Sequence, residues 1–160
     1  MAVLFNAPEL VEMAVRIEED GEKFYSKLAE TKGEPLKGIF GYLAEQEKRH
    51  IEDFKELYKT VVDSPEVIMG DVEEFKLYMA AYTDSKFLKE FVKNANTVVE
   101  AKKEPEILDF AIQFEKETLL FYYGLHDVLS EAGKDLVKNI IEQEKEHIKN
   151  LSKIKREREA

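Results

Sequence analysis

The chain contains no cysteine. Without thiols it can form no disulfide bond, no cysteine-ligated metal site and no iron–sulfur cluster. Proline and glycine are scarce, with four and seven residues among 160, so few positions interrupt a helix. No apolar run approaches the length of a membrane-spanning helix, and we therefore expect no contact with a membrane. Residues 1–8 lack the basic and apolar regions of a signal peptide, which favours a cytoplasmic location.

Basic residues are outnumbered by acidic ones, and the formal net charge is −10. This balance argues against a nucleic-acid partner and suits the attraction of cations. Charged residues make up 36% of the chain and hydrophobic residues 44%. Together with the abundance of Glu, Lys, Leu and Ala, these fractions predict an all-α protein. A chain of 160 residues is long enough for one domain with a substantial core, so we expect a single domain over residues 1–160.

Four long segments carry apolar residues at alternating steps of four and three, which predicts four amphipathic helices. The first two are expected to form a hairpin at about residues 7–61, with its turn near Gly33. The last two are expected to form a second hairpin at about residues 104–158, with its turn near Gly133. We expect the charged tail from Lys155 to Ala160 to fray.

Residues 62–103 are too apolar for a disordered linker and predict a helical crossover. Asp71 and Glu74 form a candidate capping box for a first short helix, whose predicted inward residues are Phe75, Tyr78, Met79 and Tyr82. Residues 83–85 are a candidate cap for a second, whose predicted inward residues are Phe87, Leu88, Phe91, Val92 and Ala95. Two hairpins joined by such a connection predict a four-helix bundle with one crossover.

The two predicted hairpins resemble each other in sequence. Residues 45–48, Glu-Gln-Glu-Lys, recur at 142–145, and His50-Ile51 recurs as His147-Ile148. Aligning residues 14–57 with 111–154 needs no gap and gives about 13 identities. The repeat therefore covers a whole hairpin.

Glutamates and histidines interrupt the apolar stripes of all four helices. Glu47 and Glu144 each precede a histidine by three positions, about 300° of helix rotation, so carboxylate and imidazole share a face. Glu18 and Glu47 are equally distant from the first turn and are expected at one level of an antiparallel hairpin. Glu115 and Glu144 bracket the second turn with the same separation. We therefore predict a metal centre with the ligands Glu18, Glu47, His50, Glu115, Glu144 and His147.

Four carboxylates inside an apolar bundle are costly, because burial penalises each charge and like charges repel. Two divalent cations would neutralise them, and two neutral imidazoles would complete the ligand set. Oxygen-rich ligation with some nitrogen fits iron or manganese better than zinc or copper. Tyr25 and Tyr122 lie seven residues after Glu18 and Glu115, and we predict that they hydrogen-bond and orient the carboxylates. Core packing is the alternative role of these tyrosines.

Two further polar residues lie on the same helix as Glu115. Thr118 is interpreted as a small packing residue, or as one that leaves room for water, oxygen or another small ligand. His126 lies about 16 Å along the helix from Glu115 and is predicted to be structural or at the surface. A repeat that persists for structural reasons alone is the alternative to a metal centre.

One Glu on each of two helices, with Glu-x-x-His on each of the other two, resembles the ligand pattern of ferritin-like di-iron carboxylate proteins. The stretches Glu18–Tyr25 and Glu115–Tyr122, each Glu followed after five residues by Phe-Tyr, resemble the rubrerythrin branch. The resemblance implies a ferritin-like bundle holding two iron ions, with manganese as an alternative. It further implies bridging, catalytic roles for Glu47 and Glu144, and one imidazole, His50 or His147, for each ion.

Rubrerythrins reduce hydrogen peroxide, and their relatives oxidise ferrous iron with peroxide or oxygen. The resemblance thus implies a di-iron oxidoreductase of the peroxidase or ferroxidase type. Two features depart from the family pattern. Thr118 stands where rubrerythrins usually carry one more Glu, and no cysteine is present to build a rubredoxin domain.

Electrons would therefore come from a separate donor protein, and we expect a homodimer. One alternative is an iron-handling protein that stores or delivers iron without multiple turnovers. Another is an interaction module that has kept the bundle and lost its chemistry.

Overall fold

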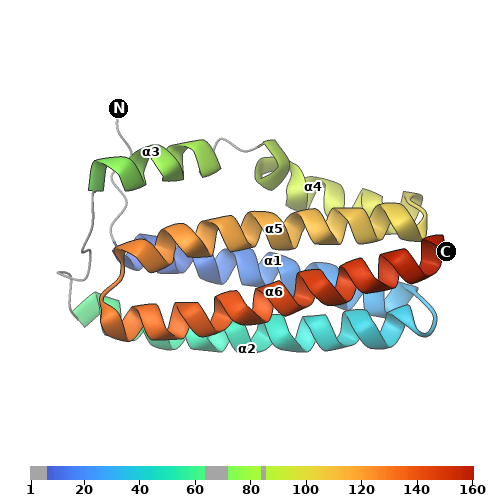
Figure 1. The fold of residues 1–160 in the computed structure, drawn as a ribbon, viewed down its shortest axis with the longest axis horizontal. Helices are drawn as coiled ribbons and strands as arrows, with labels where there is room; N and C mark the ends of the chain where they lie inside the picture. Colours follow the sequence, from blue (N-terminus) through green and yellow to red (C-terminus); the bar gives the residue numbers. More distant parts are fainter. Residues whose placement is uncertain (1–6, 64–71, 84–85) are drawn as a thin grey trace.

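The computed structural model describes residues 7–63, 72–83 and 86–160. Over these ranges the chain forms six α-helices and no β-strand (Figure 1). The helices are α1 (Ala7–Thr31), α2 (Leu36–Asp63), α3 (Val72–Thr83), α4 (Lys86–Ala101), α5 (Glu104–Val128) and α6 (Glu131–Glu159). None of the helices in the described ranges has the length and apolarity needed to cross a membrane.

Helices α1 and α2 form one antiparallel hairpin, and α5 and α6 form the other (Figure 1). The four long helices lie side by side as a bundle, in which α1 also contacts α5 and α2 also contacts α6. Proline stands in the first turn of both α1 and α5, where its missing N–H breaks no helical hydrogen bond. At the start of α5 the backbone N–H of Lys103 donates to Glu106 Oε2 at 3.0 Å, which caps the helix.

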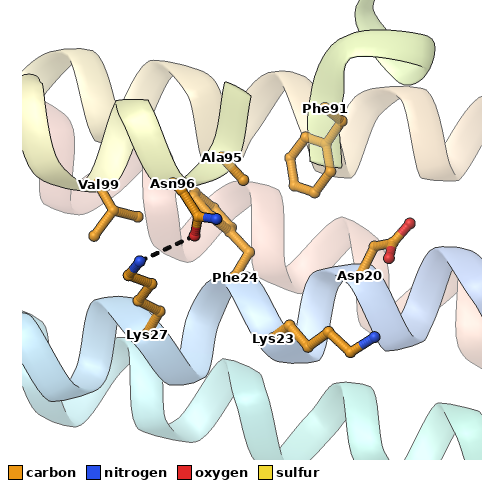
Figure 2. A pocket seen from close by; sticks show the side chains of 8 residues that line it. All are labelled: Asp20, Lys23, Phe24, Lys27, Phe91, Ala95, Asn96 and Val99. Carbon is orange, nitrogen blue, oxygen red and sulfur yellow. Dashed lines mark hydrogen bonds between the residues drawn. The ribbon is translucent and has the colours of Figure 1, made fainter. Parts of the chain in front are cut away.

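The crossover consists of α3 and α4, which follow α5 on the side of the bundle away from α2 (Figure 1). Helix α4 packs on α1 as well as on α5. Figure 2 shows the seam between α1 and α4, where Lys27 Nζ donates to Asn96 Oδ1 at 3.0 Å. Beside this bond the rings of Phe24 and Phe91 meet edge to face with their centroids 5.4 Å apart. The crossover is therefore part of the core packing.

Five of the side chains that were predicted to point inward from the crossover lie in the described part of the chain. Tyr82 and Phe91 are buried, and Tyr78, Phe87 and Ala95 pack partly buried against the core, so these inward positions are confirmed. Other predictions lie outside the described residues or side chains, namely the caps at Asp71 and residues 84–85 and the inward positions of Phe75, Met79, Leu88 and Val92.

The prediction that the C-terminal tail frays is wrong, because α6 remains helical as far as Glu159. Lys155 Nζ lies 2.6 Å from Asp109 Oδ1, and Arg158 forms an ion pair with Glu104. Both acidic partners lie on α5. The basic residues that predicted a solvated, frayed end thus form ion pairs with α5. These ion pairs hold the last turns of α6 against α5.

The buried apolar side chains form two clusters, one towards each end of the bundle. Every long helix contributes to both. On α1, Leu10 belongs to the first cluster and Leu28 to the second. On α5, Phe121 belongs to the first and Leu108 to the second. Between the two clusters, the middle of each long helix carries buried polar and charged side chains instead.

Candidate metal centre

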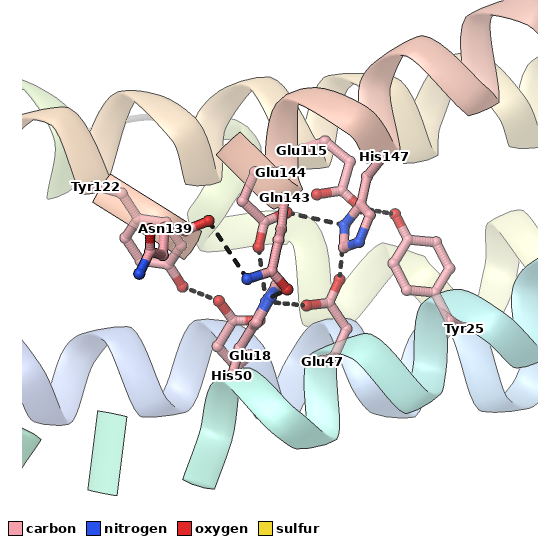
Figure 3. A network of polar contacts seen from close by, with 10 residues as sticks. All are labelled: Glu18, Tyr25, Glu47, His50, Glu115, Tyr122, Asn139, Gln143, Glu144 and His147. Carbon is pink, nitrogen blue, oxygen red and sulfur yellow. Dashed lines mark hydrogen bonds and ion pairs between the residues drawn. The ribbon is translucent and has the colours of Figure 1, made fainter. Parts of the chain in front are cut away.

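A layer of buried polar side chains lies between the two apolar clusters. We call it the polar layer, and it consists of Glu18, Glu47, His50, Glu115, Thr118, Glu144 and His147. Each of these side chains is at most 2% exposed to solvent, which is rare for glutamate. The structure brings all six predicted ligands into this layer (Figure 3).

A first group of potential ligand atoms surrounds Nδ1 of His50. This nitrogen lies 2.9 Å from Glu144 Oε1, 3.3 Å from Glu47 Oε2 and 3.5 Å from Glu18 Oε2. The four side chains come from α1, α2 and α6, and their ligand atoms all lie within 4.8 Å of one another. That spacing is compact enough for one ion to be reached by all four residues.

A second group surrounds Nδ1 of His147. This nitrogen lies 3.0 Å from Glu144 Oε2, 3.7 Å from Glu115 Oε1 and 3.9 Å from Glu47 Oε1. Glu47 and Glu144 thus belong to both groups, and each presents a different oxygen to each one. The imidazole rings themselves stack with centroids 5.8 Å apart. This arrangement matches the predicted bridging roles of the two glutamates, although metal ligation itself stays a prediction.

The two tyrosines lie on either side of the polar layer, as Figure 3 shows. Tyr25 on α1 donates a hydrogen bond to Glu115 Oε1 on α5, and Tyr122 on α5 donates one to Glu18 Oε1 on α1. The contacts with carboxylates were predicted from the sequence, but their crossing between hairpins was not. Each tyrosine holds the glutamate of the opposite hairpin, so the bonds also tie α1 to α5.

Gln143 is a residue of the site that the sequence analysis did not single out. Its Oε1 lies 3.2 Å from His50 Nε2, and its Nε2 donates to the backbone carbonyl of Asn139 at 3.4 Å (Figure 3). With the amide oriented this way, His50 Nε2 is the donor, so the Nδ1 lone pair becomes free for a metal once the ring is neutral. The signal was present in the sequence, because Gln143 and Gln46 occupy matching positions of the repeated motif.

The charges in the polar layer are not balanced by protein groups alone. Burial and the neighbouring carboxylates, Glu18 foremost among them, raise the pKa of Glu47 well above its usual range. Burial and repulsion from Glu144 raise the pKa of Glu115 to about 8. Burial acts to lower the pKa of His147, but the contacts with Glu115 and Glu144 outweigh it and raise this pKa to about 10. Without a cation, protons must therefore occupy the layer.

Glu144 differs from the other carboxylates, because it lies between the two imidazoles. Burial acts to raise its pKa, but hydrogen bonds and attraction from His147 and His50 outweigh burial and hold the pKa well below its usual range. In the metal-free protein Glu144 is therefore an ionised carboxylate between two cationic rings. Metal ions would take the place of those protons.

The residues present fit such ions. Four buried ligand atoms make no hydrogen bond of regular geometry, although two of them, His50 Nδ1 and Glu144 Oε1, lie 2.9 Å apart. They are Glu47 Oε2, Glu115 Oε2, Glu144 Oε1 and His50 Nδ1. Buried acceptors without partners are uncommon, and a bound cation is a physical explanation for several of them within the two compact ligand groups. His126, by contrast, pairs with Asp127 at 3.4 Å and lies outside both groups, in line with its predicted structural or surface role.

Comparisons with known proteins agree with this geometry. A family model, Rubrerythrin, matches residues 9–104. A search of curated proteins gives no significant match. Among solved structures, one from Thermotoga maritima that is described as a ferritin-like diiron-carboxylate protein is 31% identical, with 96% of each chain covered and a TM-score of 0.68. The predicted ferritin-like bundle is thereby confirmed, and this chain belongs to the rubrerythrin family.

Proposed function

We propose that this protein is a di-iron oxidoreductase that reduces hydrogen peroxide or oxygen. One observation carries the proposal: Glu47 and Glu144 each turn one oxygen towards His50 and the other towards His147. Two cations that share two carboxylates lie close enough to act together on one small molecule. The family and the description of the Thermotoga maritima protein support the same assignment.

We assign Glu18 and His50 to one iron, Glu115 and His147 to the other, and Glu47 and Glu144 to both. Bound at these residues, two ferrous ions would supply two electrons, which together with two protons from solvent reduce one hydrogen peroxide to two water molecules. Manganese suits the same oxygen-rich ligand set, so elemental analysis of the purified protein must decide the metal.

The surrounding residues have separate tasks in this proposal. Tyr25 holds Glu115 Oε1 and Tyr122 holds Glu18 Oε1, which orients both carboxylates before any metal binds. Gln143 holds the Nε2 proton of His50. The apolar clusters above and below the layer limit the access of bulk water to the centre.

The full-length chain, loaded anaerobically with ferrous iron, tests the proposal. We expect two irons per chain, and oxidation of both by one equivalent of hydrogen peroxide. The double variant Glu47→Ala/Glu144→Ala should bind little iron and lose peroxide turnover. The control Glu45→Gln/Glu142→Gln, at exposed positions of the same motif, should retain both properties. Wild-type-like peroxide turnover in the double alanine variant, supplied with a suitable reductant, would contradict the proposal.

A second candidate function is the handling of iron without multiple turnovers. The observation that favours it is the lack of cysteine, which leaves the chain no cysteine-ligated electron relay of its own. Excess peroxide with a chemical reductant separates the two functions, because only an enzyme continues past the first equivalent. Size-exclusion chromatography adds a second criterion: a large shell supports storage and a dimer supports the enzyme.

If the purified protein holds no transition metal and a chelator does not change its melting temperature, neither function is supported. That result would indicate an interaction module that has kept the bundle and lost its metal chemistry. The separate electron-donor protein, the homodimer and the cytoplasmic location stay predictions from the sequence.

A further inference from the structure

Thr118 belongs to the polar layer although it is not one of the predicted ligands. It lies on α5 between Glu115 and Tyr122, one helical turn from each, and is 1% exposed. At about 100° per residue, the three side chains lie within about 60° of one another around the helix. Glu115 faces the second ligand group, and Tyr122 reaches Glu18 of the first. The side chain between them therefore lies on the face of α5 that is directed at the centre.

The hydroxyl of Thr118 has no hydrogen-bond partner. A threonine in a helix usually satisfies its hydroxyl on a carbonyl of the preceding turn, as Thr31 and Thr60 do here. The two tyrosine hydroxyls of this region donate to Glu115 and Glu18. Thr118 thus provides a buried donor that the described protein groups leave unused, and a group of that kind calls for a ligand.

The matching position in the other hairpin is filled differently. Gly21 aligns with Thr118 in the repeat, and a Cβ atom placed on Gly21 would lie 3.6 Å from Glu47 Cδ. The same atom would lie 2.9 Å from Phe114 Cε1, so an aromatic ring already occupies the space next to Gly21. An apolar ring thus takes the space beside Gly21, whereas the matching position, Thr118, carries a hydroxyl without a partner. The two halves, though related in sequence, are therefore not equivalent.

We propose that Thr118 donates a hydrogen bond to a small anionic ligand, of the class of peroxide, hydroxide or azide, that binds the metal centre on the side of α5. The proposal rests on the proposed function, because the anion binds to the metal ions. In it Thr118 is the residue that decides where on the centre, and how tightly, such a ligand binds. The proposal involves no bond breaking at Thr118, only donation of its O–H.

Azide binding to the full-length protein loaded with ferric iron tests this assignment, and the absorbance of the complex reports the dissociation constant. Thr118→Val keeps the shape of the side chain and removes the donor, so azide should bind about tenfold more weakly or worse. Thr118→Ser restores the donor and should bind azide within about twofold of wild type. The control Thr60→Val, which makes the same change at an exposed position of α2, should bind azide as wild type does.

Iron is counted in every sample, which separates the possible failures. Equal azide affinity of wild type and Thr118→Val at equal iron content would overturn the role of Thr118 and leave the proposed function standing. A wild-type chain that takes up no iron would overturn both.

A second measurement needs no metal. In the metal-free protein, Thr118→Val removes a buried donor without an acceptor, so its melting temperature should equal or exceed that of wild type. A fall of several degrees would show that the hydroxyl is satisfied within the protein, and it would overturn the proposal independently of iron.

Discussion

At the scale of single residues, the centre depends on which atom of each side chain faces which neighbour. Glu47 and Glu144 are useful as bridges because their two oxygens point to different imidazoles. His50 is useful as a ligand because Gln143 occupies its other nitrogen. The neutral groups that fix these orientations are the hydroxyls of Tyr25 and Tyr122 and the amide of Gln143.

The first prediction concerns Gln143. Replacing it by Leu removes the acceptor for His50 Nε2–H, so the imidazole can rotate or change tautomer. We expect Gln143→Leu to weaken the affinity for a divalent metal by about 10–100-fold. A competition titration with a coloured chelator measures this. Gln113→Leu on the exposed face of α5 is the control and should change affinity by less than about twofold. Equal affinity of both variants would refute the role assigned to Gln143.

The second prediction concerns Tyr122, whose hydroxyl donates to buried Glu18. Tyr122→Phe leaves that carboxylate with one donor fewer in a setting where water cannot replace it. The free energy of unfolding of the metal-free protein should fall by about 1–2 kcal/mol. Urea denaturation measures the change. Tyr123→Phe, one position along and 42% exposed, should cost less than about 0.5 kcal/mol. Similar losses in the two variants would argue against the buried bond.

At the scale of helices, the close approach of α1 and α5 is set by a glycine. A Cβ atom at Gly21 would lie 2.9 Å from Phe114 Cε1. The ring of Phe114 has little room to retreat, because it stacks on Phe91 of α4 with centroids 4.2 Å apart. Gly41, in α2, has open surroundings by comparison: its added Cβ would lie 4.0 Å from Ala29 Cβ. A side chain at position 21 would therefore clash with a ring, whereas one at position 41 would fit.

Gly21→Ala and Gly41→Ala should accordingly change stability in opposite directions. Alanine is favoured over glycine in a helix by about 1 kcal/mol, but overpacking against a fixed ring costs about 1–3 kcal/mol. We expect the free energy of unfolding to fall by about 1 kcal/mol in Gly21→Ala and to rise by about 0.5–1 kcal/mol in Gly41→Ala. Chemical denaturation of both variants beside wild type decides this, and a stabilised Gly21→Ala protein would show that α1 and α5 can separate freely.

At the scale of the whole molecule, the polar layer links stability to pH and to metal. Folding raises the pKa of Glu115 from 4.5 to about 8. The stabilisation of the folded state that follows from this shift is complete below pH 4.5 and is lost as the pH rises through about 8. His147 has its pKa raised from 6.5 to about 10, so its contribution is lost as pH rises through about 10. Glu144, whose pKa is lowered, loses its contribution only in acid. Loss of the protons of Glu115 and His147 therefore lowers the free energy of unfolding in both cases as the pH rises above neutrality.

The metal-free protein should therefore melt at a lower temperature at about pH 9 than at about pH 6, by about 3 °C or more. Bound metal should reverse the trend, because ligands that have lost their protons bind cations more tightly. Differential scanning calorimetry with and without chelator measures both curves. Glu115→Gln should flatten the metal-free curve. A metal-free melting temperature that rises between these pH values would contradict the charge distribution described for the layer.

Much of the architecture could be predicted because it depends on periodicity. The apolar stripes located the four long helices, and the turn near Gly33 indicated the first hairpin. The second hairpin was also predicted, but its turn lies at Leu129 and Ser130, and Gly133, where the turn was expected, belongs to the first turn of α6. Spacing within the stripes also identified the six glutamates and histidines that meet in the polar layer. Local patterns of this kind are repeated along the chain and do not depend on which helices become neighbours.

The sequence by itself determined the helices, the repeat and the residue types of the candidate centre, because these follow from the rotation of one residue to the next. Only the tertiary structure decided the crossed tyrosine bonds, the contact of Gln143 with His50 and the pairing of Lys155 with Asp109. Each of these joins different helices. Their geometry depends on how the two hairpins dock, and that docking is governed by packing across the whole core rather than by spacing within any one segment.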